Sequence, residues 1–88
     1  MYQRVKAQQR RTVGTSSTKR ALHRGALTEV YLARDADRRV LNPVIALCKE
    51  KGVKINWVDC HAALGQACGL PLGASAVGFL RDEPVTEK

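Results

Sequence analysis

Apolar positions along the chain form short runs of two kinds. Mostly apolar runs at residues 29–33, 53–58 and 75–80, each bounded by turn-forming residues, are typical of buried strands. Between them, apolar residues recur at helical spacing over 15–24, 37–51 and 59–68. Helices that alternate with buried strands predict an α/β protein, a three-layer α/β/α sandwich around a small mixed, partly parallel sheet.

Glycines and aspartates mark the expected helix ends. Glycine suits the left-handed residue that follows a helix, so we expect the helices to end at Gly25, Gly52 and Gly69. Asp37 and Asp59 are the expected N-caps of the last two helices.

Pro43 interrupts the pattern of the middle helix, because a proline inside a helix removes one backbone hydrogen bond. That helix is expected either to begin near Asn42, with Pro43 at its first position, or to start with a separate 3₁₀ turn. In the strand that follows, Trp57 is expected to lie in the core.

The chain has room for one small domain, which we place at residues 12–80 and which begins with a brief strand. Residues 1–11 favour a weak basic helix, and residues 81–88 are expected to form a disordered polar tail. Neither a membrane-spanning run nor the apolar segment of a signal peptide is present, so no membrane partner is expected.

The net charge of +7 is concentrated in the first quarter of the chain. Residues 1–24 hold seven basic residues and no acidic one, whereas residues 25–88 hold eight of each. This asymmetry favours a polyanionic partner, although a solubilising basic tail would give the same pattern.

Cys48, Cys60 and Cys68 lie in mostly apolar surroundings. They form no CxxC pair, and neither histidine has a finger-like spacing, so we expect no metal site and no cofactor. An odd number of thiols indicates a reducing compartment, and we expect a cytoplasmic protein. Cys60 and His61 would point about 100° apart on a helix, so no catalytic pair is expected.

Residues 14–20, Gly-Thr-Ser-Ser-Thr-Lys-Arg, suit a helix that starts at a phosphate. Small hydroxyl residues leave room around the first-turn N–H groups, which carry the positive end of the helix dipole. A Walker A loop would need glycine before the lysine and Ser or Thr after it, so a nucleotide triphosphatase is disfavoured. Ordinary capping by Thr15 or Ser16 would explain part of the stretch without a ligand. Four hydroxyl residues that lead into two cations favour RNA or phosphate contact by Gly14, Thr15, Ser16, Ser17, Lys19 and Arg20.

Leu70 and Leu72 lie in a loop that Pro71 and the glycines on either side keep irregular. If they are exposed, they would pack against a base or a protein partner; otherwise they cover the end of the core. Both interpretations stay open at this point.

In order and spacing these pieces resemble the kink-turn RNA-binding ribosomal proteins, the superfamily named for the archaeal large-subunit protein seven-Ae. The bacterial single-domain members are the most similar. The resemblance covers residues 12–80 and rests on 14–25, on Ala-Arg-Asp-Ala-Asp at 33–37, and above all on Leu-Gly-Gln-Ala-Cys-Gly at 64–69. It implies the sandwich predicted above.

In that family a turn with the pattern Gly-x-Asn-Glu-x-x-Lys inserts a helix N-terminus into the widened major groove of the kink. There it reads tandem sheared G·A pairs. Gly14 keeps the glycine, Ser16 and Ser17 take the Asn and Glu places, and Arg20 takes the Lys place. Serine is too short for bidentate contacts to base edges, so binding should depend more on phosphate contacts, RNA shape and salt.

The resemblance assigns two further contacts. Asp37 lies where the family has an acid near an extruded base, and Leu41 lies where it has an apolar contact to that base. The apolar loop that packs on the RNA corresponds to Leu70, Pro71, Leu72 and Gly73.

The leading hypothesis is a non-catalytic, monomeric protein that binds kink-turns or similar helix–internal-loop–helix structures in ribosomal or regulatory RNA. The ribosome is a candidate partner. Two other functions stay open: a protein-interaction adaptor of the same fold, and the RNA-recognition part of an RNA-modifying system.

Overall fold

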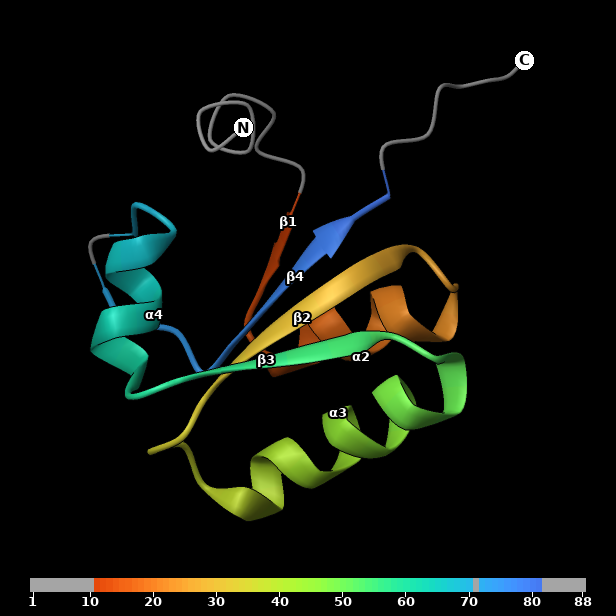
Figure 1. Ribbon diagram of the computed structural model, residues 1–88, viewed down its shortest axis with the longest axis horizontal. Coiled ribbons are helices and arrows are strands. Elements are labelled where there is room, and N and C mark those ends of the chain that lie inside the picture. Colours follow the sequence, from red (N-terminus) through yellow and green to blue (C-terminus); the bar gives the residue numbers. More distant parts are fainter. Residues whose placement is uncertain (1–10, 71, 82–88) are drawn as a thin grey trace.

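A four-stranded mixed sheet forms the centre of the protein, which we describe from a computed structural model over residues 11–70 and 72–81. The expectations for residues 1–10, Pro71 and residues 82–88 lie outside this range. The spatial order of the strands is β1-β4-β2-β3 (Figure 1). They span Arg11–Val13 (β1), Leu27–Ala33 (β2), Lys54–Val58 (β3) and Ala76–Leu80 (β4).

Strand β4 runs antiparallel to both of its neighbours, β1 and β2, while β2 and β3 are parallel. Strands β1, β2 and β3 therefore all run in the same direction, and their carboxyl ends lie at the same edge of the sheet. Loops that follow these strands are placed together at that edge, whatever their distance in sequence.

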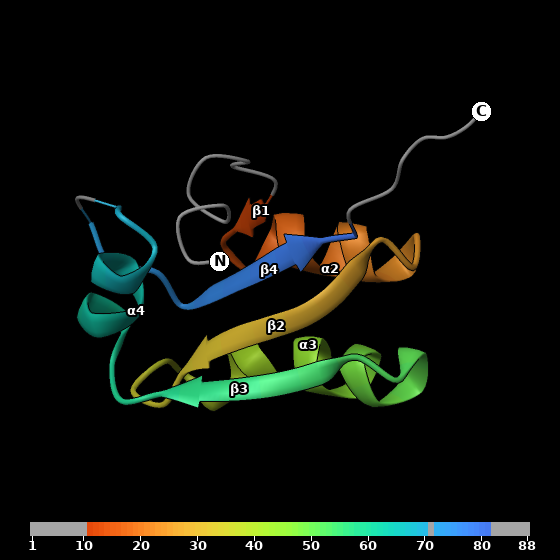
Figure 2. The same cartoon turned by 45° about the horizontal axis from the view of Figure 1, so that its top comes forward.

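Helices cover both faces of the sheet. Helices α2 (Thr15–His23) and α3 (Arg38–Lys51) pack side by side on one face, and α4 (His61–Ala67) packs on the other face (Figure 2). Along β2, Val30 and Leu32 contribute to the hydrophobic cluster under α2 and α3, whereas Ala33 contributes to the cluster under α4. The predicted three-layer sandwich with a partly parallel sheet is confirmed.

The expectations for the start of α3 and for Arg11 are wrong. Helix α3 is continuous from Arg38, so it neither begins at Asn42 nor starts with a separate 3₁₀ segment. Pro43 lies on the exposed side of α3, where water can hydrate the carbonyl group that the missing N–H leaves without a partner. Arg11, expected at the end of a helix, begins strand β1.

Aspartates bind the first N–H groups of α3 and α4. Asp37 caps α3 as predicted: its Oδ1 accepts a hydrogen bond from Arg39 N over 2.8 Å. Asp59 does not cap α4, because that helix begins one residue later, after Cys60. The acceptor is Asp35, which reaches across from the loop after β2 and bonds His61 N and His61 Nδ1, both over 2.9 Å.

These contacts lower the pKa of both aspartates. Desolvation acts to raise the pKa of Asp35, but the hydrogen bonds from His61 outweigh it. Side-chain and backbone hydrogen bonds from Arg39 lower the pKa of Asp37. Each carboxylate is therefore held in its ionised, accepting form.

Acid should remove both contacts. Because both pKa values are lowered in the folded state, the stability that they contribute is complete above the unfolded value of about 4 and is lost as the pH falls through the folded pKa. We expect the free energy of unfolding, from urea titrations followed by circular dichroism, to fall as the pH drops from about 5 to about 2. The Asp35→Asn/Asp37→Asn variant should show a smaller fall. Asp59→Asn is the matched control and should follow the wild type; an equal fall in the double variant would contradict this account.

Gly65 lets the loop after α4 approach the helix. A Cβ at this position would collide with Leu72 O and Gly73 Cα, and Leu70 N donates to Gly65 O over 2.7 Å. Alanine in place of glycine normally stabilises a helix by about 1 kcal/mol. Here we expect Gly65→Ala to destabilise the protein by about 1–3 kcal/mol in urea unfolding, because backbone atoms must move. Gln66→Ala, at the exposed neighbouring position, should be neutral or stabilising. A Gly65→Ala protein more stable than the wild type would show that the loop is not held against α4.

Candidate nucleic-acid interface

Backbone hydrogen bonds join the carboxyl ends of β1 and β2 to the start of β4, and the carboxyl end of β2 to that of β3. They run from Gly14 N to Ala76 O (2.8 Å), from Ala33 N to Ser75 O (3.0 Å) and from Arg34 N to Val58 O (2.8 Å). We call the surface formed by residues 13–17, 34–40, 69–70 and 72–75 the loop edge. It brings together the three segments that the sequence predicted as contacts: the turn at Gly14, the loop at Asp37 and the apolar loop.

Helix α2 starts at the loop edge without a side-chain cap. Its N-cap is Gly14, with φ of 94° and ψ of 158°, a conformation that L side chains rarely adopt. The first helical hydrogen bond runs from Thr18 N to Gly14 O, and within the described residues no side chain caps the N–H groups before it. The alternative that Thr15 or Ser16 serves as an ordinary cap is therefore wrong.

The four hydroxyl residues of α2 divide into two groups. Thr18 is fully buried, and its Oγ1 lies 2.9 Å from Thr12 Oγ1, which fixes the helix on β1. Ser16 is exposed, and Thr15 and Ser17 are half-buried. The first turn of α2 thus presents three hydroxyl residues to the loop edge, and no acidic residue accompanies them.

The two cations of this stretch differ in exposure. Arg20 is exposed and Lys19 is half-buried. Residues four apart lie on the same side of a helix, so Arg20 shares the exposed face with Ser16. Arg20 is better placed than Lys19 to meet a large ligand lying over the start of α2.

Asp37 and Leu41, which the resemblance placed near an extruded base, differ in exposure. Asp37 is on the loop edge, but besides capping α3 it forms an ion pair with Arg39, at 3.2 Å between Oδ2 and Nη2. Leu41 is fully buried in the cluster under α2 and α3, so its side chain offers no surface to a base. The spacing of Leu41, Val44 and Cys48 marks the buried stripe of α3 and could have placed Leu41 there.

Large exposed apolar side chains gather at the loop edge. Within the described residues they are Leu72, which is 79% exposed, and Val13 and Val40, which are both 43% exposed. The sequence had pointed to Leu72 but not to the two valines. Leu70 packs against the cluster under α4 and so covers the end of the core, whereas Leu72 is exposed. Gly73 is exposed. It lies so close to His61 that a Cβ at position 73 would collide with the histidine ring.

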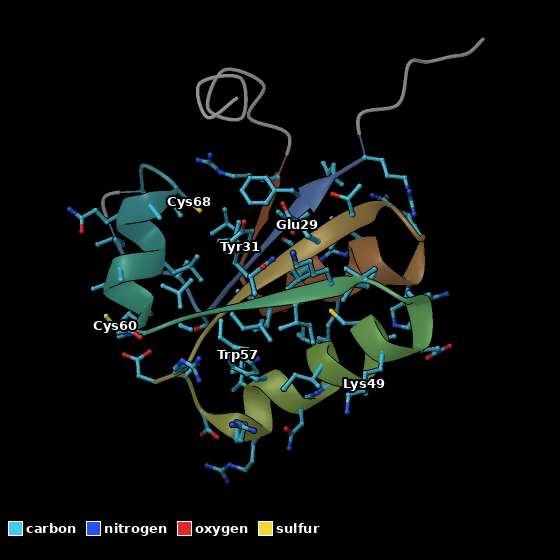
Figure 3. The ribbon with its side chains drawn as sticks, viewed as in Figure 1. Glu29, Tyr31, Lys49, Trp57, Cys60 and Cys68 are labelled. Atoms are coloured by element: carbon cyan, nitrogen blue, oxygen red, sulfur yellow. The ribbon has the colours of Figure 1, made fainter. Side chains whose placement is uncertain are left out.

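Three arginines that the sequence had not singled out also lie on the loop edge: Arg34, Arg38 and Arg39. Trp57, labelled in Figure 3, is only partly buried. The guanidinium groups of Arg34 and Arg38 lie over its ring. Positive charge at this surface therefore comes from the middle of the chain as well as from α2.

The described residues offer little for metal or nucleophilic chemistry. Residues 11–70 and 72–81 contain no group of three or more His, Cys, Asp or Glu side chains that could hold a metal ion. Burial raises the pKa of the Cys48 thiol to about 11 and also raises that of Cys68. The pair formed by Asp35 and His61 is half-exposed, and no described side chain is hydrogen-bonded to His61 Nε2.

None of the described helices has the length and apolar character needed to cross a membrane.

Comparison with known proteins places this fold and sequence in one family. The pattern of the "Ribosomal protein L7Ae/L30e/S12e/Gadd45 family" matches residues 1–87. RNA-binding protein YbxF of Geobacillus stearothermophilus is 40% identical over 80 residues, 91% of this chain and 98% of the relative. An RNA-binding protein of Bacillus pumilus is 40% identical over 79 residues, 90% of this chain and 96% of the relative.

More distant relatives include the large ribosomal subunit protein eL8 of Haloquadratum walsbyi, 31% identical over 68 residues, 76% of this chain and 57% of the relative. The structure of the 15.5kD RNA binding protein of Giardia lamblia shares the fold, with a TM-score of 0.82 and 22% identity over 91% of this chain and 68% of that one. These matches confirm the resemblance that the motifs suggested. The chain belongs to the "Ribosomal protein L7Ae/L30e/S12e/Gadd45 family".

Proposed function

We propose that this protein binds structured RNA through the loop edge and recognises kink-turns or similar helix–internal-loop–helix structures, in ribosomal or regulatory RNA. It acts without catalysis, as a cytoplasmic monomer. The relatives named above as RNA-binding and ribosomal proteins support this function. The observation that carries it is the start of α2, whose first-turn N–H groups no described side chain caps, with Arg20 exposed on the same helix.

The start of α2 suits an anionic ligand for a simple reason. Its first N–H groups need acceptors, and α3 and α4 obtain them from Asp37 and Asp35. Phosphate oxygens of an RNA backbone can supply them to α2, since a helix N-terminus favours negative charge. The hydroxyl groups of Ser16 and Ser17 can hydrogen-bond base edges or phosphates but are too short for bidentate contacts.

The apolar side chains of the loop edge suit the irregular part of such an RNA. Bases that leave the stack in an internal loop expose their faces, and proteins commonly cover them with apolar or planar side chains. Leu72, Val13 and Val40 are available for this contact, and Leu72 is the most exposed. In this proposal Val40 takes the role that Leu41 cannot fill, because Val40 lies on the exposed side of α3 beside Asp37.

The proposal predicts a preference for kinked RNA. We expect tighter binding, by at least about tenfold, to a kink-turn RNA than to the same RNA with its G·A pairs replaced by Watson–Crick pairs. Fluorescence anisotropy at several salt concentrations measures both affinities. Affinity for both RNAs should fall steeply with salt, because phosphate contacts dominate. Equal affinities at moderate salt would leave only nonspecific cationic binding, and no binding to either RNA would favour a protein-interaction adaptor.

Charge reversal on α2 locates the binding face. We expect Arg20→Glu to weaken binding to the kink-turn RNA by about tenfold or more, because it places a carboxylate beside the phosphate backbone. Arg24→Glu makes the same change of charge one turn further from the start of α2, at its C-cap, and should cost less. If Arg24→Glu costs as much as Arg20→Glu, the RNA does not lie at the start of α2.

A further inference from the structure

We propose that Arg34 and Arg38, held against Trp57, form a second contact of the loop edge and bind the phosphate backbone of the RNA. This proposal rests on the RNA-binding function proposed above. It extends the binding surface from the start of α2, on the β1 side of the sheet, to the edge strand β3.

The three side chains come from different elements that meet at the loop edge. Arg34 directly follows β2, Arg38 is the first residue of α3, and Trp57 is the penultimate residue of β3. The Cζ atoms of Arg34 and Arg38 lie 5.8 Å and 5.5 Å from the centre of the indole ring. Trp57 lies on the side of the sheet that faces α3, away from Tyr31 and Glu29 (Figure 3).

In the described part of the chain the two guanidinium groups have no acidic ion-pair partner, although acids are close in sequence. Asp35 is bonded to His61, and Asp37 is paired with Arg39. Within residues 11–70 and 72–81, neither Arg34 nor Arg38 forms an ion pair. Two like charges beside one ring repel each other, and the face of the indole compensates them only in part. An external anion would complete the compensation.

The position of the two guanidinium groups over the ring suits phosphate in particular. A guanidinium in a cation–π contact keeps N–H groups of its rim for oxygen acceptors. Its side chain is also partly ordered before binding, so less conformational entropy is lost when a phosphate is bound. The planar rim can donate two parallel hydrogen bonds to one phosphate.

Arg34, Arg38 and Trp57 lie where an RNA bound at the start of α2 can also reach them. Helices α2 and α3 pack side by side, and both begin at the loop edge. An RNA that reaches the first turn of α2 therefore has a path along this edge toward Arg38, at the first turn of α3. One RNA, with its evenly spaced phosphates, can occupy both places, whereas a single protein carboxylate would occupy one.

The test compares matched pairs of charge removals in the full chain. Arg34→Gln/Arg38→Gln removes the two charges over Trp57, and Lys49→Gln/Lys51→Gln removes two charges at the other end of α3. The probe is the kink-turn RNA described above, and the readout is the slope of log affinity against log salt concentration. Losing two phosphate contacts should reduce this slope by about 2 and weaken binding by at least about tenfold at low salt. The lysine pair should change the slope much less.

A conservative variant separates RNA contact from a structural role. Arg34→Lys/Arg38→Lys keeps both charges but loses the planar groups that lie over Trp57 and pair with phosphate. We expect it to restore most of the salt slope and only part of the affinity. Trp57 is the single tryptophan of the chain, so its fluorescence should also change when RNA binds the wild type. Circular dichroism verifies that each variant is folded.

The outcomes of this test distinguish failure of the second contact from failure of kink recognition. A glutamine pair with the wild-type slope and affinity overturns the second contact, while the preference for kinked RNA stands on its own measurement. A lower slope in the glutamine pair, together with equal affinity for kinked and Watson–Crick RNA, supports the second contact and overturns kink recognition. An equal effect of the lysine pair also overturns the proposal, because charge at the loop edge would then have no special role.

Discussion

Strand β4 holds the candidate site together, because its first residues accept hydrogen bonds from the strands on both sides. Ala76 O binds Gly14 N, and Ser75 O binds Ala33 N. Since β4 runs antiparallel to both neighbours, its amino end meets their carboxyl ends. The turn before α2 and the loop before α3 are thereby fixed relative to each other, although twenty or so residues separate them in the sequence. The apolar loop, which leads directly into β4, is fixed at the same place.

Two of the three described helices have a side-chain acceptor at their start, and α2 does not. Asp37 and Asp35 supply acceptors to α3 and α4, and a glycine in an unusual conformation stands at the start of α2. A side chain at that place could provide a cap but would also stand between the helix and a ligand. Uncapped N–H groups cost stability, commonly about 1 kcal/mol for a missing cap. We infer that this cost is retained because RNA supplies the acceptors.

The sequence predicted the sandwich, the order of its elements and the segments of the loop edge, because hydrophobic periodicity and turn residues are local signals. It misplaced what depends on contacts between distant segments. Asp35, and not Asp59, binds the start of α4 because the loop after β2 reaches across to it. Leu41 is a different case: family resemblance placed it on the RNA, although the local spacing of the buried stripe of α3 indicates the core, where it lies. The exposure of Val13 and the position of two arginines over Trp57 follow only from the packed structure.

RNA binding at the start of α2 is the central claim, and amide NMR tests it most directly. In a titration of the ¹⁵N-labelled protein with a kink-turn RNA, we predict the largest shifts at the N–H groups of Thr15, Ser16 and Ser17. Amides at the opposite end, around Gly52, should change little. Large shifts around Gly52 together with unchanged amides at residues 15–17 would contradict the account, because the RNA would then lie away from the loop edge.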